Sequence, residues 1–416
     1  MARARNVPTF SLWWGGGLVV RKGGKLNRRE FAKSAAMMVG AAGLRGAGKP
    51  VRAYVGTYSS PQGAEGSKGR GSGIYLFEMD PMSGYLTQRN VFKDDTNPSW
   101  LAINRTKTHL YAANETEAGG VSAYSIDGGS GELDLLNRAS SGGAGPAHLS
   151  IHPNGKHLLV ANYAGGTVAV LPILEDGKVG EPIDVHKHTG TLGGEKAASG
   201  PKGSFAISGH DKPHAHMIES DPMGHFVLAA DLGLDEIFIY KFDVSTGKMT
   251  PNSPPSFKLP SGDGPRHFVF HANRHWFYTL EEESSTLVAC DYDSARGTLK
   301  AKQTISTLPK DFAGTDFTSE IVMSPDGRFL YVGNRLHDTI AWFSIESDGK
   351  LTWAGEEWTR GDYPRSFTID PSGHFLYSCN QRADAIACFK RDLKTGILGF
   401  TGQYTPVGTP AILRFL

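Results

Sequence analysis

The 416-residue sequence predicts an all-β protein, a seven-bladed β-propeller, and three observations support this prediction. First, a cassette of short strands with alternating apolar residues, joined by Pro-, Gly- and Asn-containing turns, repeats along the chain, as in residues 363–389. Second, nine positions separate the turn residue from the end of the second strand, as between Pro371 and Asn380. Third, the second strand ends seven times, at intervals of 46 to 69 residues, a period typical of propeller blades. The seven end positions are Thr57, Asn114, Asn162, Asp231, Glu281, Asn334 and Asn380.

Residues 1–49 precede the first repeat, and the propeller is expected to occupy residues 50–416. The pair Arg28-Arg29, with Phe31 and Lys33 close behind, precedes an eleven-residue apolar run over 34–44. This pattern resembles a twin-arginine export signal, and eleven residues are too few to cross a bilayer, which needs about twenty. We therefore predict export, to the periplasm, with no membrane span in the mature protein. The alternative is a basic tail on a cytoplasmic protein.

The blades follow in order, with two Gly-, Ser- and Lys-rich interruptions. The first blade starts at Val51 and is interrupted by residues 63–73, and the longest interruption, residues 186–212, separates blades three and four. Loops of this length in a compact domain are usually functional or disordered. The first blade lacks an inner strand, but residues 410–415 match the inner strands of the other blades, such as residues 98–103. The C-terminal strand should therefore complete blade one, closing the ring and removing a free sheet edge.

Composition argues against several classes of function. The net charge is +1, so no overall field favours nucleic acid or an anionic membrane. Cys290, Cys379 and Cys388 have no metal-like spacing; Cys379 and Cys388 lie on adjacent strands and could form a bridge, but we expect buried thiols. The sequence has no serine in a nucleophile elbow, no phosphate-binding glycine loop and no clustered metal ligands. We predict no cofactor and no metal, and a monomer or small homo-oligomer.

One mouth of the central channel should gather polar side chains. Inner strands line the channel, and each second strand runs antiparallel to its inner strand. The start of an inner strand and the end of the second strand therefore lie at the same mouth of the channel. The positions following the second strands are Tyr58, Glu115, Tyr163, Leu232, Glu282, Arg335 and Gln381. The positions near the inner-strand starts are Trp100, His148, Met217, His267, Glu320, Ser366 and Ile412, with His214, His216, Arg266 and Arg365 as neighbours. A concave cluster of titratable groups predicts binding or catalysis.

Pro-His-Ala-His at 213–216 and Gly-Pro-Arg-His at 264–267 resemble elements of the propeller-type 6-phosphogluconolactonase family, and the similarity covers residues 51–416. This family also includes carboxy-muconate lactonizing enzymes. The resemblance implies a seven-bladed propeller, a central active site, metal-independent lactone chemistry and a small anionic or sugar lactone as substrate. By motif it suggests the catalytic candidates His216, Arg266 and Glu282. It suggests as substrate-binding residues His148, His214, His267, Glu320, Arg335 and Arg365, to which Gln381 is added by its place in the ring.

As a hypothesis, Glu282 or His216 activates a water molecule, and the sequence leaves this choice open. Arg266 would stabilise the oxyanion or hold the substrate anion, with Arg335 and Arg365 as planar clamps. Two alternatives use the same groups: a lactonizing enzyme that works in the opposite direction, and a propeller that binds a ligand or protein without catalysis. Export would favour an unphosphorylated sugar lactone or another anionic lactone, so the substrate stays open. His214 and His216 could also form a metal pair, but no third ligand is evident.

Overall fold

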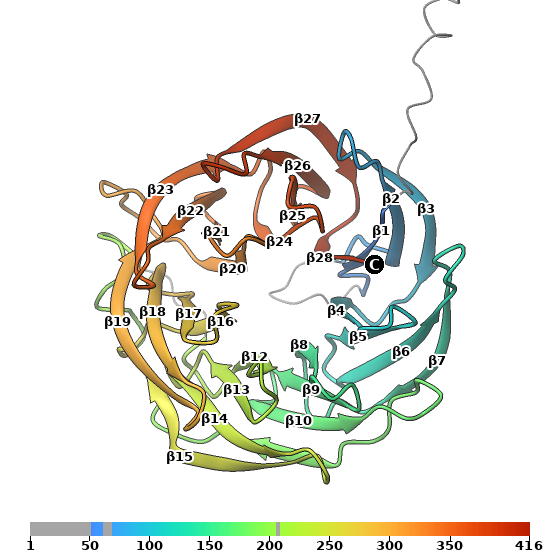
Figure 1. The fold of residues 1–416 in the computed structure, drawn as a ribbon, viewed down its shortest axis with the longest axis horizontal. Coiled ribbons are helices and arrows are strands. Elements are labelled where there is room, and N and C mark those ends of the chain that lie inside the picture. The colour runs from blue at the N-terminus through green and yellow to red at the C-terminus, as the bar shows by residue number, and fades with distance from the viewer. Residues whose placement is uncertain (1–50, 61–68, 205–208) are drawn as a thin grey trace, which may run out of the picture. The chain divides into compact units, whose positions relative to one another are not determined.

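Seven antiparallel four-stranded sheets surround a central channel in the computed structural model (Figure 1). The structure describes residues 51–60, 69–204 and 209–416, and the predicted export motif lies outside these ranges. Within these ranges the regular secondary structure is entirely β-strand, and no helix is long and apolar enough to span a membrane. The prediction of a seven-bladed all-β propeller is confirmed.

Each blade has an inner, a second, a third and an outer strand. The inner strands are β28 (Pro410–Phe415), β4 (Pro98–Ile103), β8 (Pro146–Ile151), β12 (Ala215–Ser220), β16 (Pro265–Phe270), β20 (Thr318–Met323) and β24 (Pro364–Ile369). The second strands are β1 (Val51–Thr57), β5 (His109–Asn114), β9 (His157–Asn162), β13 (Phe226–Asp231), β17 (Trp276–Glu281), β21 (Phe329–Asn334) and β25 (Phe375–Asn380). All seven second strands end at the positions that the repeat spacing predicts.

The remaining strands complete the sheets toward the rim. The third strands are β2 (Gly73–Met79), β6 (Gly120–Ile126), β10 (Thr167–Pro172), β14 (Glu236–Asp243), β18 (Thr286–Asp293), β22 (Thr339–Ile345) and β26 (Ala385–Arg391). The outer strands are β3 (Leu86–Lys93), β7 (Leu133–Ala139), β11 (Asp184–Lys187), β15 (Lys248–Lys258), β19 (Thr298–Ser306), β23 (Leu351–Trp358) and β27 (Leu398–Pro406). The long interruption before blade four begins two residues later than predicted, because His186 and Lys187 belong to β11.

The C-terminal strand closes the ring as predicted. Strand β28 pairs antiparallel with β1, with Leu413 opposite Val55, so the first blade contains both ends of the propeller (Figure 1). Blades seven and one then share an apolar core in which Val55, Tyr377 and Leu413 are fully buried. Similar cores lie between the other blades, because each sheet buries apolar side chains on both faces. All three cysteines are buried in these layers as free thiols.

Tyrosine hydrogen bonds connect neighbouring blades. In five blades a tyrosine on the second strand donates its hydroxyl proton to the carbonyl of a glycine in the outer turn of the next blade. The pairs are Tyr54–Gly131 (2.7 Å), Tyr111–Gly177 (3.0 Å), Tyr278–Gly349 (2.9 Å), Tyr331–Gly396 (2.7 Å) and Tyr377–Gly84 (2.7 Å). The five glycines have φ between 73° and 82°, a region that favours glycine. The Tyr377 bond joins blade seven to blade one and so strengthens the closure.

We expect Tyr278→Phe to destabilise the propeller. The substitution keeps the buried ring but leaves the Gly349 carbonyl without its tyrosine donor, which costs about 1–3 kcal/mol. Denaturant unfolding followed by circular dichroism measures this loss. Tyr404→Phe is the matched control, because that ring is 50% exposed. Equal unfolding midpoints for the two variants would show that the blade-to-blade bond contributes nothing.

Candidate functional site

The inner strands carry a β-bulge near their starts, and these bulges determine which side chains reach the channel. In β12, Ala215 pairs with Asp231 and Met217 with the preceding residue of β13, so His216 is the extra residue. In β16, Arg266 occupies the same position between Pro265 and His267. An extra residue re-aims the side chains beside it. As a result two consecutive residues, the bulged one and the next, line the channel in these blades.

The bulged residues form the first layer, together with the residues that follow the second strands. We call His216, Arg266, Glu282, Arg335 and Arg365, with Tyr58 and Glu115 beside them, the front cluster. The Glu282 carboxylate lies 3.1 Å from Arg266 Nε and 2.5 Å from Arg335 Nη2, and all three side chains are buried. Two guanidinium groups therefore share one buried carboxylate.

The third arginine belongs to a second group in the same cluster. Arg365 Nη2 lies 3.8 Å from Glu115 Oε1, and the Tyr58 hydroxyl donates to Glu115 Oε2 at 2.9 Å. The Arg365 guanidinium carbon is 5.4 Å from the centre of the Tyr58 ring, a cation–π distance. The cluster thus holds three guanidinium groups against two carboxylates, so an excess of positive charge faces the channel.

His216 is a neutral imidazole beside this positive charge. Its ring packs edge-on against Tyr163 and His267, with centroids 5.4 and 5.0 Å away, and its buried Nδ1 has no hydrogen-bond partner among the described residues. Burial, and then the neighbouring charge of Arg266, hold the pKa of His216 well below its ordinary value of 6.5. Burial also lowers the pKa of Arg266, to about 10, so this group stays cationic at neutral pH.

The second layer consists of the residues after the bulges, and its rings fill the middle of the channel. Trp100 lies 4.5 Å from His148 and 5.2 Å from His267, measured between ring centroids. His267 Nδ1 lies 2.9 Å from Glu320 Oε1, a hydrogen bond that joins blades five and six. This layer separates the front cluster from a second space, which we call the rear cavity.

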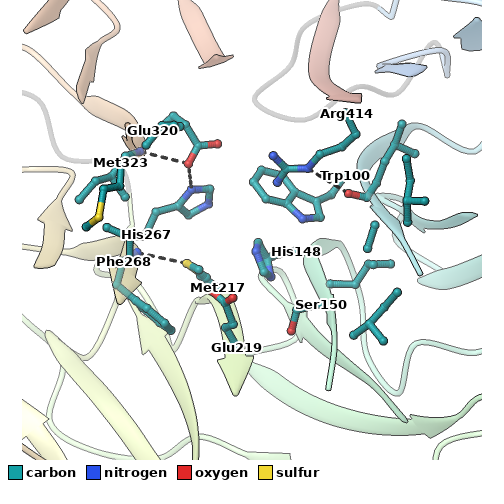
Figure 2. A pocket seen from close by; sticks show the side chains of 18 of the residues that line it. Trp100, His148, Ser150, Met217, Glu219, His267, Phe268, Glu320, Met323 and Arg414 are labelled. Carbon is teal, nitrogen blue, oxygen red and sulfur yellow. Dashed lines mark hydrogen bonds and ion pairs between the residues drawn. The ribbon is translucent and has the colours of Figure 1, made fainter. Parts of the chain in front are cut away.

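The rear cavity has a volume of about 570 Å³, whereas the space enclosed at the front cluster is about 10 Å³. Figure 2 shows Trp100, His148, His267 and Glu320 on its wall, with Glu219 and Arg414 on other sides. Small-molecule sites usually measure about 300–1,000 Å³, so volume alone would favour the rear cavity. Chemistry favours the front cluster, because the neutral imidazole and the arginine–carboxylate groups converge there.

The predicted site residues divide between these two spaces. The structure brings His216, Arg266, Glu282, Arg335 and Arg365 together in the front cluster. His148 and Glu320 line the rear cavity, and His267 borders both.

Two further predicted residues, His214 and Gln381, are buried and contact residues near the front cluster. His214 stacks on Tyr163 at 4.2 Å, and its ring nitrogens contact the Tyr163 carbonyl and Asp211 Oδ1. Gln381 is buried, and its backbone N–H donates to the Tyr363 carbonyl. In the part of the chain that the structure describes, no three His, Cys, Asp or Glu side chains could hold a metal ion.

Sequence reasoning did not select four residues that belong to these spaces. Glu115 and Tyr58 occupy the same ring of positions as Glu282 but were not singled out. Glu219 and Arg414 lie two residues beyond the second layer, where alternation along a strand returns a side chain to the channel. The repeat spacing could therefore have identified Glu219 and Arg414, as the residues two positions after Met217 and Ile412.

Glu281, beside Glu282, departs from the repeat and bears on the charge of the site. In blades six and seven the equivalent Asn334 and Asn380 donate side-chain hydrogen bonds to loop carbonyls at 2.8 and 2.9 Å. Glu281 is fully buried, and burial, with Asp263 nearby, raises the pKa of its carboxyl well above 4.5. Burial thus favours the neutral form of Glu281, which limits the negative charge beside Glu282.

Comparison with known proteins shows which family this chain resembles. The family described as "Lactonase, 7-bladed beta-propeller" matches residues 52–415. A 6-phosphogluconolactonase of Bacillus subtilis is 35% identical over 365 residues, covering 87% of this chain and 97% of the relative. Another protein of that name, from Formosa agariphila, is 32% identical over 335 residues, covering 79% and 91%. The solved structure of a periplasmic gluconolactonase of Pseudomonas aeruginosa is 28% identical with a TM-score of 0.78, covering 88% of this chain and 99% of that chain.

Proposed function

Because this chain belongs to the seven-bladed β-propeller lactonase family, we propose that it hydrolyses a sugar lactone to the open-chain acid at the front cluster. The observation that supports this most is the neutral His216, whose buried Nδ1 has no partner among the described residues, beside three guanidinium groups. Lactone hydrolysis needs such a pair of functions: a base for water and positive charge for the developing oxyanion.

The proposed reaction has two steps. His216 accepts a proton from water as the water oxygen bonds to the lactone carbonyl carbon, and Arg266 stabilises the resulting oxyanion. The tetrahedral intermediate then breaks its ring C–O bond, and the imidazolium of His216 returns the proton to the leaving ring oxygen. Glu282 is the weaker choice as base, because two guanidinium groups already contact its carboxylate. Its role would be to fix the positions of Arg266 and Arg335.

The same cluster suggests how a lactone would be held. Arg335 and Arg365 come from blades six and seven and carry the planar donor sets that bind carboxylate or phosphate groups in two-point fashion. They would bind an anionic substituent, or hydroxyl groups where none is present. The relatives named 6-phosphogluconolactonase and gluconolactonase support a sugar lactone as the substrate class.

Arg266→Ala is expected to lower lactonase kcat/KM by about 10²–10³-fold, the usual cost of losing an oxyanion donor. Acid release from δ-gluconolactone and its 6-phosphate, corrected for spontaneous hydrolysis, is the measurement. Arg274→Ala is the matched control, since Arg274 lies in an exposed turn on blade five. Turnover of Arg266→Ala within twofold of the wild type would overturn the assignment. Activity only on carboxy-muconate lactones would favour the lactonizing alternative.

His216→Gln should lower turnover by about 10²–10⁴-fold, the range of general-base contributions. In the wild type, loss of kcat/KM on the acid side should begin below pH 6.5, because burial and Arg266 lower the pKa of His216 and protonation removes the base. A profile of kcat/KM against pH tests whether the pKa of the base lies below 6.5. An acid limb at or above pH 6.5, or a His216→Gln variant within tenfold of the wild type, would exclude His216 as the base.

We also propose that the chain is exported through its twin-arginine motif, which the periplasmic relative supports. Replacing both Arg28 and Arg29 by Lys should retain the protein in the cytoplasm of a Gram-negative host. Arg21→Lys, outside the motif, is the control and should leave the distribution unchanged. Fractionation followed by immunoblotting measures the result, and equal export of the double variant would contradict the proposal.

A further inference from the structure

The rear cavity contains charged groups that the proposed lactone chemistry does not use. Arg414 enters it from β28 of blade one, Glu219 from β12 of blade four and Glu320 from β20 of blade six. Figure 2 shows the Arg414 guanidinium and the Glu219 carboxylate on opposite sides of the open space. The layer of Trp100, His148 and His267 separates these groups from most of the front cluster.

The basic side of the cavity presents free donors. Arg414 Nε donates to the Leu101 carbonyl at 3.3 Å, and the guanidinium carbon lies 4.7 Å from the centre of a Trp100 ring. These contacts fix the plane of the guanidinium. Its two Nη groups make no hydrogen bond or ion pair with any residue that the structure describes. A planar guanidinium group with two unused Nη donors can form two parallel hydrogen bonds to a carboxylate.

Two carboxyl groups stand elsewhere on the wall of the cavity. Glu320 is 5% exposed; its Oε1 is bound to His267 and to a backbone N–H, while its buried Oε2 has no partner in the described chain. Glu219 forms no hydrogen bond or ion pair with the described residues. Desolvation raises the pKa of each carboxyl to about 7, and the charge of Arg414 offsets this rise only in part.

A charged group without a partner is stabilised when a group of opposite charge binds beside it, and most of all where it is buried, as Glu320 is. A simple anion would satisfy Arg414 but not the two carboxyl groups, and a simple cation would leave Arg414 alone. The wall between them is largely apolar, including Ile151, Val269 and Ile321. The complementary ligand therefore carries a carboxylate, an ammonium group and an apolar body.

We propose that the rear cavity binds a small zwitterion of the apolar amino-acid type, with its carboxylate on Arg414 and its ammonium group at Glu219, across the open space (Figure 2). This site is distinct from the front cluster and does not rest on the lactonase assignment. Its volume of about 570 Å³ lies within the range of small-molecule sites.

Calorimetric titration of the wild-type protein with three isosteric probes tests the proposal. L-Leucine carries both charges, 4-methylpentanoate lacks the ammonium group, and 3-methylbutylamine lacks the carboxylate. We expect saturable binding of L-leucine in the micromolar to millimolar range, and at least about tenfold weaker binding of each single-charge probe. Absence of leucine binding, or equal binding of the three probes, would overturn the proposal.

Two variants locate the binding. Glu219→Gln keeps the side-chain shape and should weaken L-leucine at least about tenfold while leaving the affinity for 4-methylpentanoate unchanged. Arg414→Met should weaken L-leucine and 4-methylpentanoate alike, with circular dichroism confirming that β28 still closes the ring. Lactonase turnover of Glu219→Gln should equal that of the wild type, since Glu219 lies outside the front cluster. Leucine affinity unaffected by both variants would place the binding elsewhere and refute the proposed site.

Discussion

The β-bulge at the start of the inner strands is the constraint on which the channel chemistry depends. A regular strand would send alternate residues to the channel and the others into the sheet packing. The bulge adds one residue, so His216 and Met217, or Arg266 and His267, both face the axis. The first residue of each pair supplies charge or a polar group to the front, and the second fills the centre. Without the bulge, Arg266 would have to enter an apolar layer between blades.

The two layers also separate two electrostatic environments. At the front, positive charge predominates, which lowers the pKa of His216 and keeps it neutral. Behind the aromatic layer, acids outnumber arginine, and the pKa of Glu219 and of Glu320 is raised. Both shifts come mainly from burial; at the front Arg266 lowers the pKa of His216 further, whereas behind the layer Arg414 partly offsets the rise at the two carboxyl groups. The channel therefore contains one space in which positive charge predominates and another in which acidic and basic groups lie together.

The sequence predicted the fold closely, because strand ends and turns are local features repeated seven times. The spacing located Asn380 and Glu281 as strand ends, and the match of residues 410–415 to inner strands predicted ring closure. The repeat spacing also predicted that Arg266, Glu282 and His216 lie at one mouth of the channel. It did not distinguish the faces of the aromatic layer, so His148 and Glu320 were grouped with the front. That distinction depends on bulge register and on packing between different blades, which no single repeat encodes.

Closure by β28 means that the most C-terminal strand of the propeller completes its first blade. Strand β1 must wait until β28 has been synthesised, so the closing pair forms between the residues of the propeller that are furthest apart in sequence, and such contacts form slowly. Arg414 lies on β28, and Glu219 lies three blades away. A molecule that contacts both residues therefore binds only the closed ring, and by mass action it stabilises the pairing of β28 with β1.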